Sequence, residues 1–363
     1  MKFLLCFGTR PEAIKMAPIY VELKKRNIPC QVCVTAQHRS MLDQVLEYFK
    51  IVPDYDLGLM EVDQSLNKLS SKILSEFDEI LKIVLPDIVL VHGDTTTSAL
   101  AALASFHRQI KVGHIEAGLR TFKKDSPFPE ELNRQLTARI ADFHFAPSVI
   151  AQENLLKENV CKDLILISGN TIVDAIQMAF RKNQNIYPEQ IGLEKEVFRA
   201  NLVLVTLHRR ENLGKGLEEI CEAIKEIAKE DVQIIFPVHL NPNVRRIVYE
   251  ILGEIKNLHL VEPVPYIMML HLIKNSKLII SDSGGIQEEA IVLKKPVIVT
   301  RKYTERVEGV EAGYCFLTGS NKNEIILKAK EILKKPFIYN ELKNPYGNGN
   351  SASKIIDFLI SKI

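Results

Sequence analysis

Short apolar, β-branched runs alternate with helix-patterned segments along nearly the whole chain. The first run, Phe3 to Phe7, leads into a segment in which Pro11 suits the first turn of a helix. Such alternation is typical of a parallel sheet, because each parallel strand must be reached by a crossover that is usually helical. The pattern therefore predicts an α/β fold.

The periodicity fades after Arg181 and restarts at Val203. A chain of 363 residues is long enough for two domains of ordinary size. We expect two Rossmann-like, doubly wound parallel-sheet domains, over residues 1–169 and 170–349. A turn-rich stretch then precedes a short final helix, expected from Ala352 to Ile360.

The composition is that of a globular protein, 46% hydrophobic and 25% charged, with a formal net charge of +2. No block of like charge stands out, which argues against a nucleic-acid partner or a membrane surface. No apolar run approaches the roughly 20 residues that span a bilayer, and the start of the chain is too short for a signal-peptide core. We expect a soluble protein of the cytoplasm.

The six cysteines are scattered, which suits a reducing compartment. Cys30 and Cys33 fall in one apparent strand, where their separation of about 10 Å is too long for a disulfide. No second cysteine pair completes a zinc motif. We expect both residues to be structural, and we expect no metal.

Carboxylates follow two successive strand-like runs. The run from Ile88 leads to Asp94, the run from Val112 leads to Glu116, and a third acid, Glu130, opens the next helix. Ligands bind at the carboxyl ends of the strands in open α/β sheets. Acids gathered there suggest general acid–base chemistry in a cleft. The alternative is that each acid only caps a turn.

Basic and imidazole side chains also follow strand-like runs. Arg10 and Lys15 come after the first strand, where the alternative is ordinary surface charge. His208 and His239 each follow a later strand, where the alternative is a structural role. Neither histidine shares a recognisable ligand spacing with other residues, so metal binding is not expected.

A glycine-rich junction lies between the run Leu278 to Ile280 and a helical segment. Ser283 or Asp282 would cap that helix, and Gly284 and Gly285 would let a ligand approach its first turn. The free N–H groups of a helix N-terminus favour anions, which makes this junction a candidate phosphate site. Glu289, about one turn further, could accept hydrogen bonds from sugar hydroxyls. An ordinary turn between a strand and a helix is the alternative.

Five motifs together resemble the non-hydrolysing UDP-N-acetylglucosamine 2-epimerases, and the match runs over nearly the whole chain. They are Gly8-Thr-Arg-Pro-Glu-Ala-Ile-Lys-Met-Ala-Pro18, His92-Gly-Asp-Thr-Thr96, His114-Ile-Glu-Ala-Gly-Leu-Arg120, His208-Arg-Arg-Glu-Asn212 and Asp282-Ser-Gly-Gly-Ile-Gln-Glu-Glu289. The resemblance implies a GT-B type fold, with two Rossmann-like lobes facing across a cleft and the last helix, within 350–363, crossing back to the first lobe. It also implies a homodimer.

The resemblance further implies roles for individual residues. Residues at the reacting sugar and diphosphate would be Arg10, Lys15, Asp94, Glu116, Glu130 and His208. Residues that hold UDP would be Ser283, Gly284, Gly285, Glu289 and Arg306. The family interconverts UDP-N-acetylglucosamine and UDP-N-acetylmannosamine through elimination and re-addition of UDP. The first strand lacks a G-x-G-x-x-G, so no nicotinamide cofactor is expected.

Several positions depart from the family pattern. Val264, Met269 and Lys302-Tyr303 stand where the family often has other residues, which leaves the exact UDP-2-acetamido sugar open. Many relatives also bind a second UDP-N-acetylglucosamine as an activator. Residues matching that second site are Gln37, Glu130, Arg209 and His239, whereas Ser40 replaces a Gln and Asp63 replaces an Arg. An acid in place of an Arg that faces a diphosphate predicts weak or absent activation.

Three other functions remain open at this stage. A hydrolysing epimerase would release N-acetylmannosamine and UDP. A GT-B glycosyltransferase would have the same fold but would require an acceptor, because fold alone does not define function. A nucleotide-sugar sensor would bind without turnover.

Overall fold

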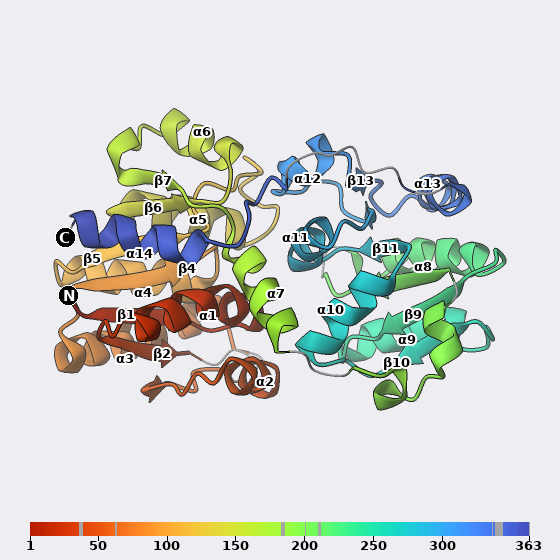
Figure 1. Ribbon diagram of the computed structural model, residues 1–363, viewed down its shortest axis with the longest axis horizontal. Helices are drawn as coiled ribbons and strands as arrows, with labels where there is room; N and C mark the ends of the chain where they lie inside the picture. The colour runs from red at the N-terminus through yellow and green to blue at the C-terminus, as the bar shows by residue number, and fades with distance from the viewer. Residues whose placement is uncertain are drawn as a thin grey trace. The chain divides into compact units, whose positions relative to one another are not determined.

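The structure is a computed structural model that describes residues 1–35, 39–61, 64–182, 186–199, 201–209, 212–335, 337 and 344–362, with 39–41 and 199 described by their backbone alone. The chain forms two compact units, one of Met1–Arg181 with Tyr346–Ile363 and one of Lys182–Pro345. Each unit is built on its own parallel sheet (Figure 1). The predicted α/β class with two parallel-sheet domains is confirmed.

The first unit contains a seven-stranded sheet of order β3-β2-β1-β4-β5-β6-β7. Its strands are β1 (Phe3–Phe7), β2 (Cys30–Val34), β3 (Tyr55–Asp56), β4 (Ile88–His92), β5 (Lys111–Ile115), β6 (Phe143–Ala146) and β7 (Ile165–Ile167). Every pair of neighbours is parallel. Strand order reverses between β1 and β4, the position at which such sheets bind ligands. Apolar residues fill both central strands because helices cover both faces.

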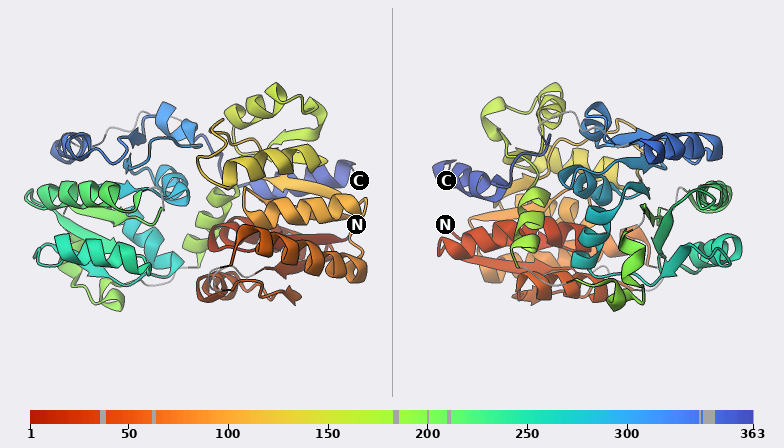
Figure 2. Two further views of the ribbon diagram at one scale, coloured as in Figure 1. Left: turned by 180° about the vertical axis from the view of Figure 1, so that it is seen from behind. Right: turned by 45° about the vertical axis from the view of Figure 1, so that its right-hand side comes forward.

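Helices cover the two faces of this first sheet in separate groups. One group packs mutually and comprises α1 (Arg10–Lys25), α7 (Thr171–Arg181) and α14 (Ser351–Lys362), with α2 (Arg39–Phe49) against α1. In Figure 1 the C-terminal helix α14 lies beside α1. The left-hand view of Figure 2 brings forward the other group, α3 (Leu66–Val84), α4 (Thr96–His107) and α5 (Glu130–Ile140). A further helix, α6 (Val149–Lys157), packs on β6 and β7.

The boundary of the first unit differs from the division at 169/170 drawn from the sequence. Asn170 donates its main-chain N–H to the carbonyl of Tyr346 at 2.9 Å, and the carboxylate of Asp174 accepts main-chain N–H groups from Ser351 and Ala352. These bonds join the start of α7 to the returning C-terminal segment. Because α7 also buries its apolar face against α1 and α14, it belongs to the first unit.

The second unit contains a six-stranded sheet of order β10-β9-β8-β11-β12-β13. Its strands are β8 (Leu202–Thr206), β9 (Gln233–Pro237), β10 (Leu258–Val261), β11 (Leu278–Ser281), β12 (Val297–Val299) and β13 (Cys315–Leu317). One face packs on α8 (Lys215–Ile227), α9 (Pro242–Leu252) and α13 (Lys322–Lys334). A second group of helices packs separately from the first and consists of α10 (Tyr266–Asn275), α11 (Gly284–Val292) and α12 (Val307–Glu311). Here strand order reverses between β8 and β11.

The described residues also bear on the expectations for disulfides, membrane-spanning helices and metal sites. The six cysteines, all of them in described positions, are free thiols, and Cys33 on β2 is the cross-strand partner of the buried Cys6 on β1. Of the helices in the described ranges, none combines the length and apolar character that crossing a bilayer demands. The described part of the chain also contains no group of three or more His, Cys, Asp or Glu residues arranged to hold a metal ion.

Candidate active site

The sequence-predicted site residues lie in two sets, one in each unit. The first unit contains Arg10, Lys15, Asp94, Glu116 and Glu130, and the second contains His208, Arg209, His239, Ser283, Gly284, Gly285, Glu289 and Arg306. In both units the residues follow strands at or next to the reversal of strand order. Gln37 and Asp63 lie outside the described residues, as does the side chain of Ser40.

The start of α1 carries Arg10 and Lys15. Thr9 caps this helix in a capping box with Glu12, whose carboxylate accepts the Thr9 main-chain N–H at 2.8 Å. The same buried carboxylate accepts the Thr95 hydroxyl at 2.8 Å, which joins the start of α1 to the start of α4. Arg10, the first residue of the helix, is half-buried beside the end of β1.

Lys15 and Glu116 form a buried ion pair. The Lys15 ammonium contacts Glu116 Oε2, and the two side chains are only 3% and 5% exposed. Glu116 has a φ of 62°, which is uncommon for a residue with a side chain and typical of functional sites. Asn170 donates from Nδ2 to the same oxygen at 3.4 Å, and His92 Nε2 lies 3.8 Å from it. The Glu116 carboxylate is therefore held close to an ammonium group at the end of β5.

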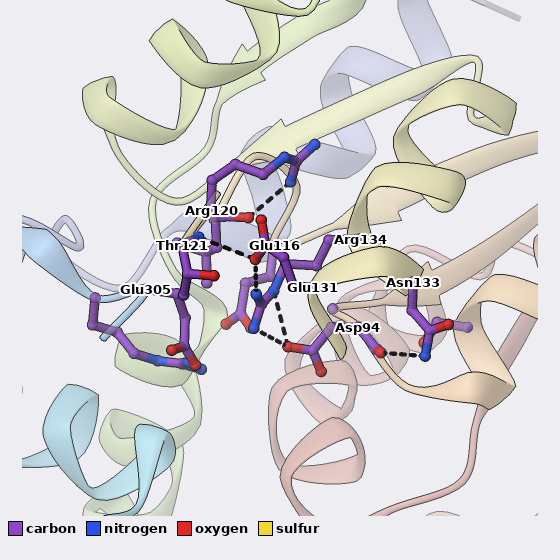
Figure 3. Close-up of polar contacts among 12 residues, drawn as sticks. Asp94, Glu116, Arg120, Thr121, Glu131, Asn133, Arg134 and Glu305 are labelled. Atoms are coloured by element: carbon purple, nitrogen blue, oxygen red, sulfur yellow. Dashed lines mark hydrogen bonds and ion pairs between the residues drawn. The ribbon is translucent and has the colours of Figure 1, made fainter. Parts of the chain in front are cut away.

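Helix α5 holds Asp94 at the end of β4 (Figure 3). Arg134 donates from Nε and Nη2 to Asp94 Oδ2, at 3.1 and 2.7 Å. Asn133 donates from Nδ2 to the Asp94 carbonyl at 3.0 Å. The Arg134 side chain is 2% exposed, whereas that of Asp94 is 22% exposed. A ligand can thus reach the Asp94 carboxylate from one side while a buried guanidinium holds the other.

Glu131 and Arg134 are site residues that the sequence analysis did not single out. The buried Glu131 carboxylate accepts main-chain N–H groups from Thr121 and Phe122, each at 3.0 Å, and Arg134 Nη1 at 2.5 Å (Figure 3). The available signal was the spacing of Glu131 and Arg134, three residues apart in the first turn of a helix. Glu130, the first residue of α5, is half-buried at the same helix N-terminus, which favours a negative charge.

Two buried histidines, one on β5 and one on β6, are held neutral. Burial lowers the pKa of His114 to about 3, although its contact with the Gly93 carbonyl acts in the opposite direction. Burial likewise lowers the pKa of His144 to about 4. His114 Nε2 lies 2.7 Å from the Gly93 oxygen, so the neutral ring donates its proton there. Both rings are therefore uncharged in the fold at neutral pH.

In the second unit, Asp282 organises the loop after β8. Its buried carboxylate accepts the main-chain N–H groups of His208 and Arg209, at 3.1 and 3.0 Å, and Nδ2 of Asn212 at 3.0 Å. Burial alone would raise the pKa of Asp282, but these bonds and the His208 ring outweigh it and lower that pKa. The His208 ring also stacks on His239, with 6.0 Å between ring centroids.

The start of α11 differs in one detail from the prediction. Ser283 is the N-cap residue by position, but its side chain makes no capping bond to the described chain, and its N–H donates to Ser281 Oγ at 3.0 Å. Asp282 does not cap the helix either, because its carboxylate is occupied by the loop after β8. The expected side-chain cap is therefore wrong.

Gly284 and Arg306 lie in direct contact at this helix start. A Cβ added to Gly284 would lie 2.7 Å from Cζ and Nη1 of Arg306, so any other residue at this position would displace the guanidinium. Arg306 donates from Nε to Glu288 at 2.9 Å and from Nη1 to Glu305. A buried guanidinium thus adjoins the free N–H groups of a helix N-terminus, as an anion site requires. An added Cβ on Gly285 would meet no described atom within 4 Å.

Comparison with known proteins supplies the family. The model of the family described as UDP-N-acetylglucosamine 2-epimerase matches residues 21–360. The chain belongs to the UDP-N-acetylglucosamine 2-epimerase family. Among family members, the UDP-N-acetylglucosamine 2-epimerase of Bacillus subtilis (strain 168) is 49% identical, over 99% of this chain and 95% of that protein. The Escherichia coli (strain K12) enzyme of the same name is 47% identical, over 99% and 98%.

Solved structures of family members have the same architecture. The crystal structure of the Neisseria meningitidis UDP-GlcNAc 2-epimerase bound to UDP-GlcNAc superposes with a TM-score of 0.92, at 45% identity, over 99% of this chain and 100% of that chain. The Methanocaldococcus jannaschii enzyme in complex with UDP-GlcNAc and UDP gives 0.88 at 38% identity, over 99% and 100%. A glycotransferase of kitacinnamycin, 13% identical with a TM-score of 0.62, shares the fold alone.

Proposed function

We propose that this protein interconverts UDP-N-acetylglucosamine and UDP-N-acetylmannosamine by inverting the second carbon of the sugar, without releasing the free sugar. Membership of the epimerase family supports the substrate and the reaction type. The observation that carries the proposal for this chain is the pairing of strand-end carboxylates with buried cations, Glu116 with Lys15 and Asp94 with Arg134.

The chemistry of the substrate favours an elimination. The hydrogen on the second carbon has no adjacent carbonyl to acidify it, so simple deprotonation and reprotonation would be very slow. A base instead removes that proton while the bond from the first carbon to the UDP oxygen breaks and its electron pair leaves with UDP. The product is an unsaturated 2-acetamidoglucal. A proton then returns to the opposite face of the second carbon, and UDP adds again to the first.

Each half of this reaction requires different groups. Proton transfer on two faces of the ring requires more than one carboxylate, and Asp94, Glu116 and Glu130 supply these groups in the proposal. Departure of the diphosphate requires cationic and N–H donors. Arg10 and His208, with the start of α11, would supply these donors.

The nucleotide would bind to the second unit. The diphosphate would meet the N–H groups of Gly284 and Gly285 and the Ser283 hydroxyl, together with the Arg306 guanidinium, which lies beside Gly284. Glu289, largely buried on α11, would accept the ribose hydroxyls. Assembly as a homodimer remains a prediction from the family resemblance, and a cytoplasmic location remains a prediction from the composition of the sequence.

Proton NMR of UDP-N-acetylglucosamine with the protein in heavy water tests the proposal. We expect UDP-N-acetylmannosamine to appear with deuterium at the second carbon, in the absence of any acceptor. Free N-acetylmannosamine as the main early product would instead establish a hydrolysing epimerase. Turnover only with an acceptor would indicate a glycosyltransferase, and binding without turnover would indicate a sensor.

Two conservative variants test the residue assignment in the same experiment. Asp94→Asn and Glu116→Gln keep the size of each side chain but remove its ability to exchange a proton. Each is expected to lower kcat by about 100-fold or more, the usual contribution of a positioned acid or base. Turnover at the normal rate by both variants would rule out the proposed proton transfers.

A further inference from the structure

The first turn of α5 joins two separate strand-end loops. One loop follows β4 and carries Asp94, and the other follows β5, carries Glu116 and continues to Phe122. Arg134 and Asn133 donate hydrogen bonds to Asp94 in the first loop (Figure 3). The Glu131 carboxylate accepts hydrogen bonds from main-chain N–H groups of the second loop. Because Arg134 also donates to Glu131, the two loops are linked through one buried ion-pair network.

The geometry of this network depends on a guanidinium. Arg134 directs Nε and Nη2 to a single oxygen of Asp94 while Nη1 reaches Glu131. A lysine offers one nitrogen on a flexible stem and cannot reproduce a planar fork with three directed donors. Arginine also keeps its positive charge throughout the accessible pH range. Arg134 therefore holds Asp94 in one orientation and opposite a permanent charge.

Arg134 and Glu131 are buried, whereas Asp94, the proposed reacting group, is accessible. The Arg134 side chain is 2% exposed, and Glu131 is completely buried, so neither presents a surface to a ligand. The Asp94 side chain, at 22% exposed, is the accessible member of the network. An effect of Arg134 on the reaction must thus pass through Asp94 or through the linked loops.

We propose that Arg134, assisted by Asn133, is a positioning residue that aims the Asp94 carboxylate at the substrate and keeps it charged for proton transfer. This inference rests on the proposed function, in which Asp94 exchanges a proton with the sugar. A displacement of about 1 Å at a reacting group can cost about 100-fold in rate. Substrate binding, in contrast, depends on other residues.

The test compares Arg134→Lys, Asp94→Asn and the double variant by steady-state kinetics and by deuterium exchange at the second carbon. We expect Arg134→Lys to lower kcat by about 100-fold with KM changed by less than about threefold. If Arg134 acts through Asp94, the double variant loses no more than Asp94→Asn alone, within about twofold. The matched control is Arg139→Lys, an exposed arginine on the last turn of the same helix, which should behave as the unmodified protein.

Two results would overturn the inference while leaving Asp94 in its proposed role. One is normal kcat for Arg134→Lys while Asp94→Asn is inactive. The other is a double variant whose loss equals the product of the two single losses, since that indicates an independent structural role. Normal turnover by Asp94→Asn would remove Asp94 from the reaction, and with it both the proposed assignment and this inference.

A second variant covers the case in which Arg134→Lys does not fold. Asn133→Ala removes only the bond to the Asp94 carbonyl. It should lower kcat by about fivefold at unchanged KM, and it too should add nothing in the Asp94→Asn background. Independent additive losses would again overturn the inference. Circular dichroism and UDP binding by calorimetry establish that each variant is folded.

Discussion

The carboxylate of Asp282 lies 3.2 Å from Nδ1 of His208 and also accepts the main-chain N–H of the same residue. A carboxylate can only accept, so this contact places a proton on Nδ1 and determines the tautomer of the ring. Asp282 is completely buried, whereas the His208 side chain is 36% exposed. The exposed ring is therefore oriented from behind by a group that no ligand touches.

Replacement of Asp282 by Asn should destabilise the protein. An Asn keeps one acceptor oxygen, but its NH2 group would take the place of Oδ1 and meet the main-chain N–H and Nδ1 of His208. The contacts of the buried charge would also weaken, and bonds to a charged group are worth about 1.5–3 kcal/mol each. We expect a loss of about 3 kcal/mol in the free energy of unfolding, measured with urea. The exposed Asp231, changed in the same way, is the control and should shift the midpoint little. Equal midpoints for the two variants would show that the Asp282 contacts contribute nothing.

Gly284→Ala should weaken the binding of UDP. The new methyl group would displace the Arg306 guanidinium, which Glu288 and Glu305 otherwise hold against the helix start. Loss of one charge-assisted bond corresponds to about tenfold or more in Kd, measured by calorimetry. Gly216→Ala is the control, because its Cβ would meet Ser320 at an ordinary 3.6 Å. Unchanged affinity in the Gly284 variant would show that Arg306 does not contribute to binding the diphosphate.

Acid should destabilise the fold through its buried histidines. Burial lowers the pKa of His114 to about 3 and that of His144 to about 4, whereas histidines of the unfolded chain titrate near 6.5. As the pH falls from about 6.5 to 4, the unfolded state binds protons that the folded state does not. The free energy of unfolding should therefore decrease by up to about 1.4 kcal/mol per pH unit for each histidine.

A single substitution isolates the contribution of His114. His114→Gln should make the acid-side slope of unfolding free energy against pH shallower, by up to about 1.4 kcal/mol per pH unit. His107→Gln, at an exposed position on α4, should leave that slope unchanged. Slopes that agree between wild type and His114→Gln would mean that His114 is not held neutral in the fold.

Activation by a second substrate molecule should be weak or absent. This expectation rests on the family resemblance, by which Asp63 would stand in place of an Arg of the activator site and Ser40 in place of a Gln. An acid in place of an Arg opposes a diphosphate, so the rate should rise hyperbolically with substrate concentration. The double substitution Ser40→Gln and Asp63→Arg should introduce sigmoidal kinetics. A strongly sigmoidal curve in the unmodified protein, abolished by changing His239, would contradict this expectation.

Periodicity predicted the main elements of the fold but missed one edge strand of each sheet. The strand at Phe3–Phe7 and the final helix, which spans Ser351–Lys362, are confirmed, because each has a clear pattern of buried apolar residues. The predicted sheets lacked β3 and β13, of two and three residues. Edge strands this short bury few side chains, so they have little periodic pattern. Their position depends on a neighbouring strand that is distant in sequence.

The site divides in a similar way. Residues at strand ends were identifiable because local patterns define where a strand stops, as with Asp94 and Glu116. The residues that hold these side chains in place, such as Asp282 and Arg134, were not identifiable from the sequence. Asp282 appeared to be a helix cap until its partners, His208 and Arg209, more than 70 positions earlier, were in view. Arg134 likewise looked like an ordinary helix residue, because nothing local relates it to Asp94.

The course of the chain has a consequence for dissecting the protein. The second unit is one uninterrupted segment, Lys182–Pro345, so we expect it to fold when it is expressed by itself. A fragment ending at Arg181 would instead lack α14 and leave the apolar surface that Ile355, Ile356 and Leu359 cover open to water. That fragment should aggregate, whereas a circular permutant that joins α14 to the original N-terminus would restore an intact first unit.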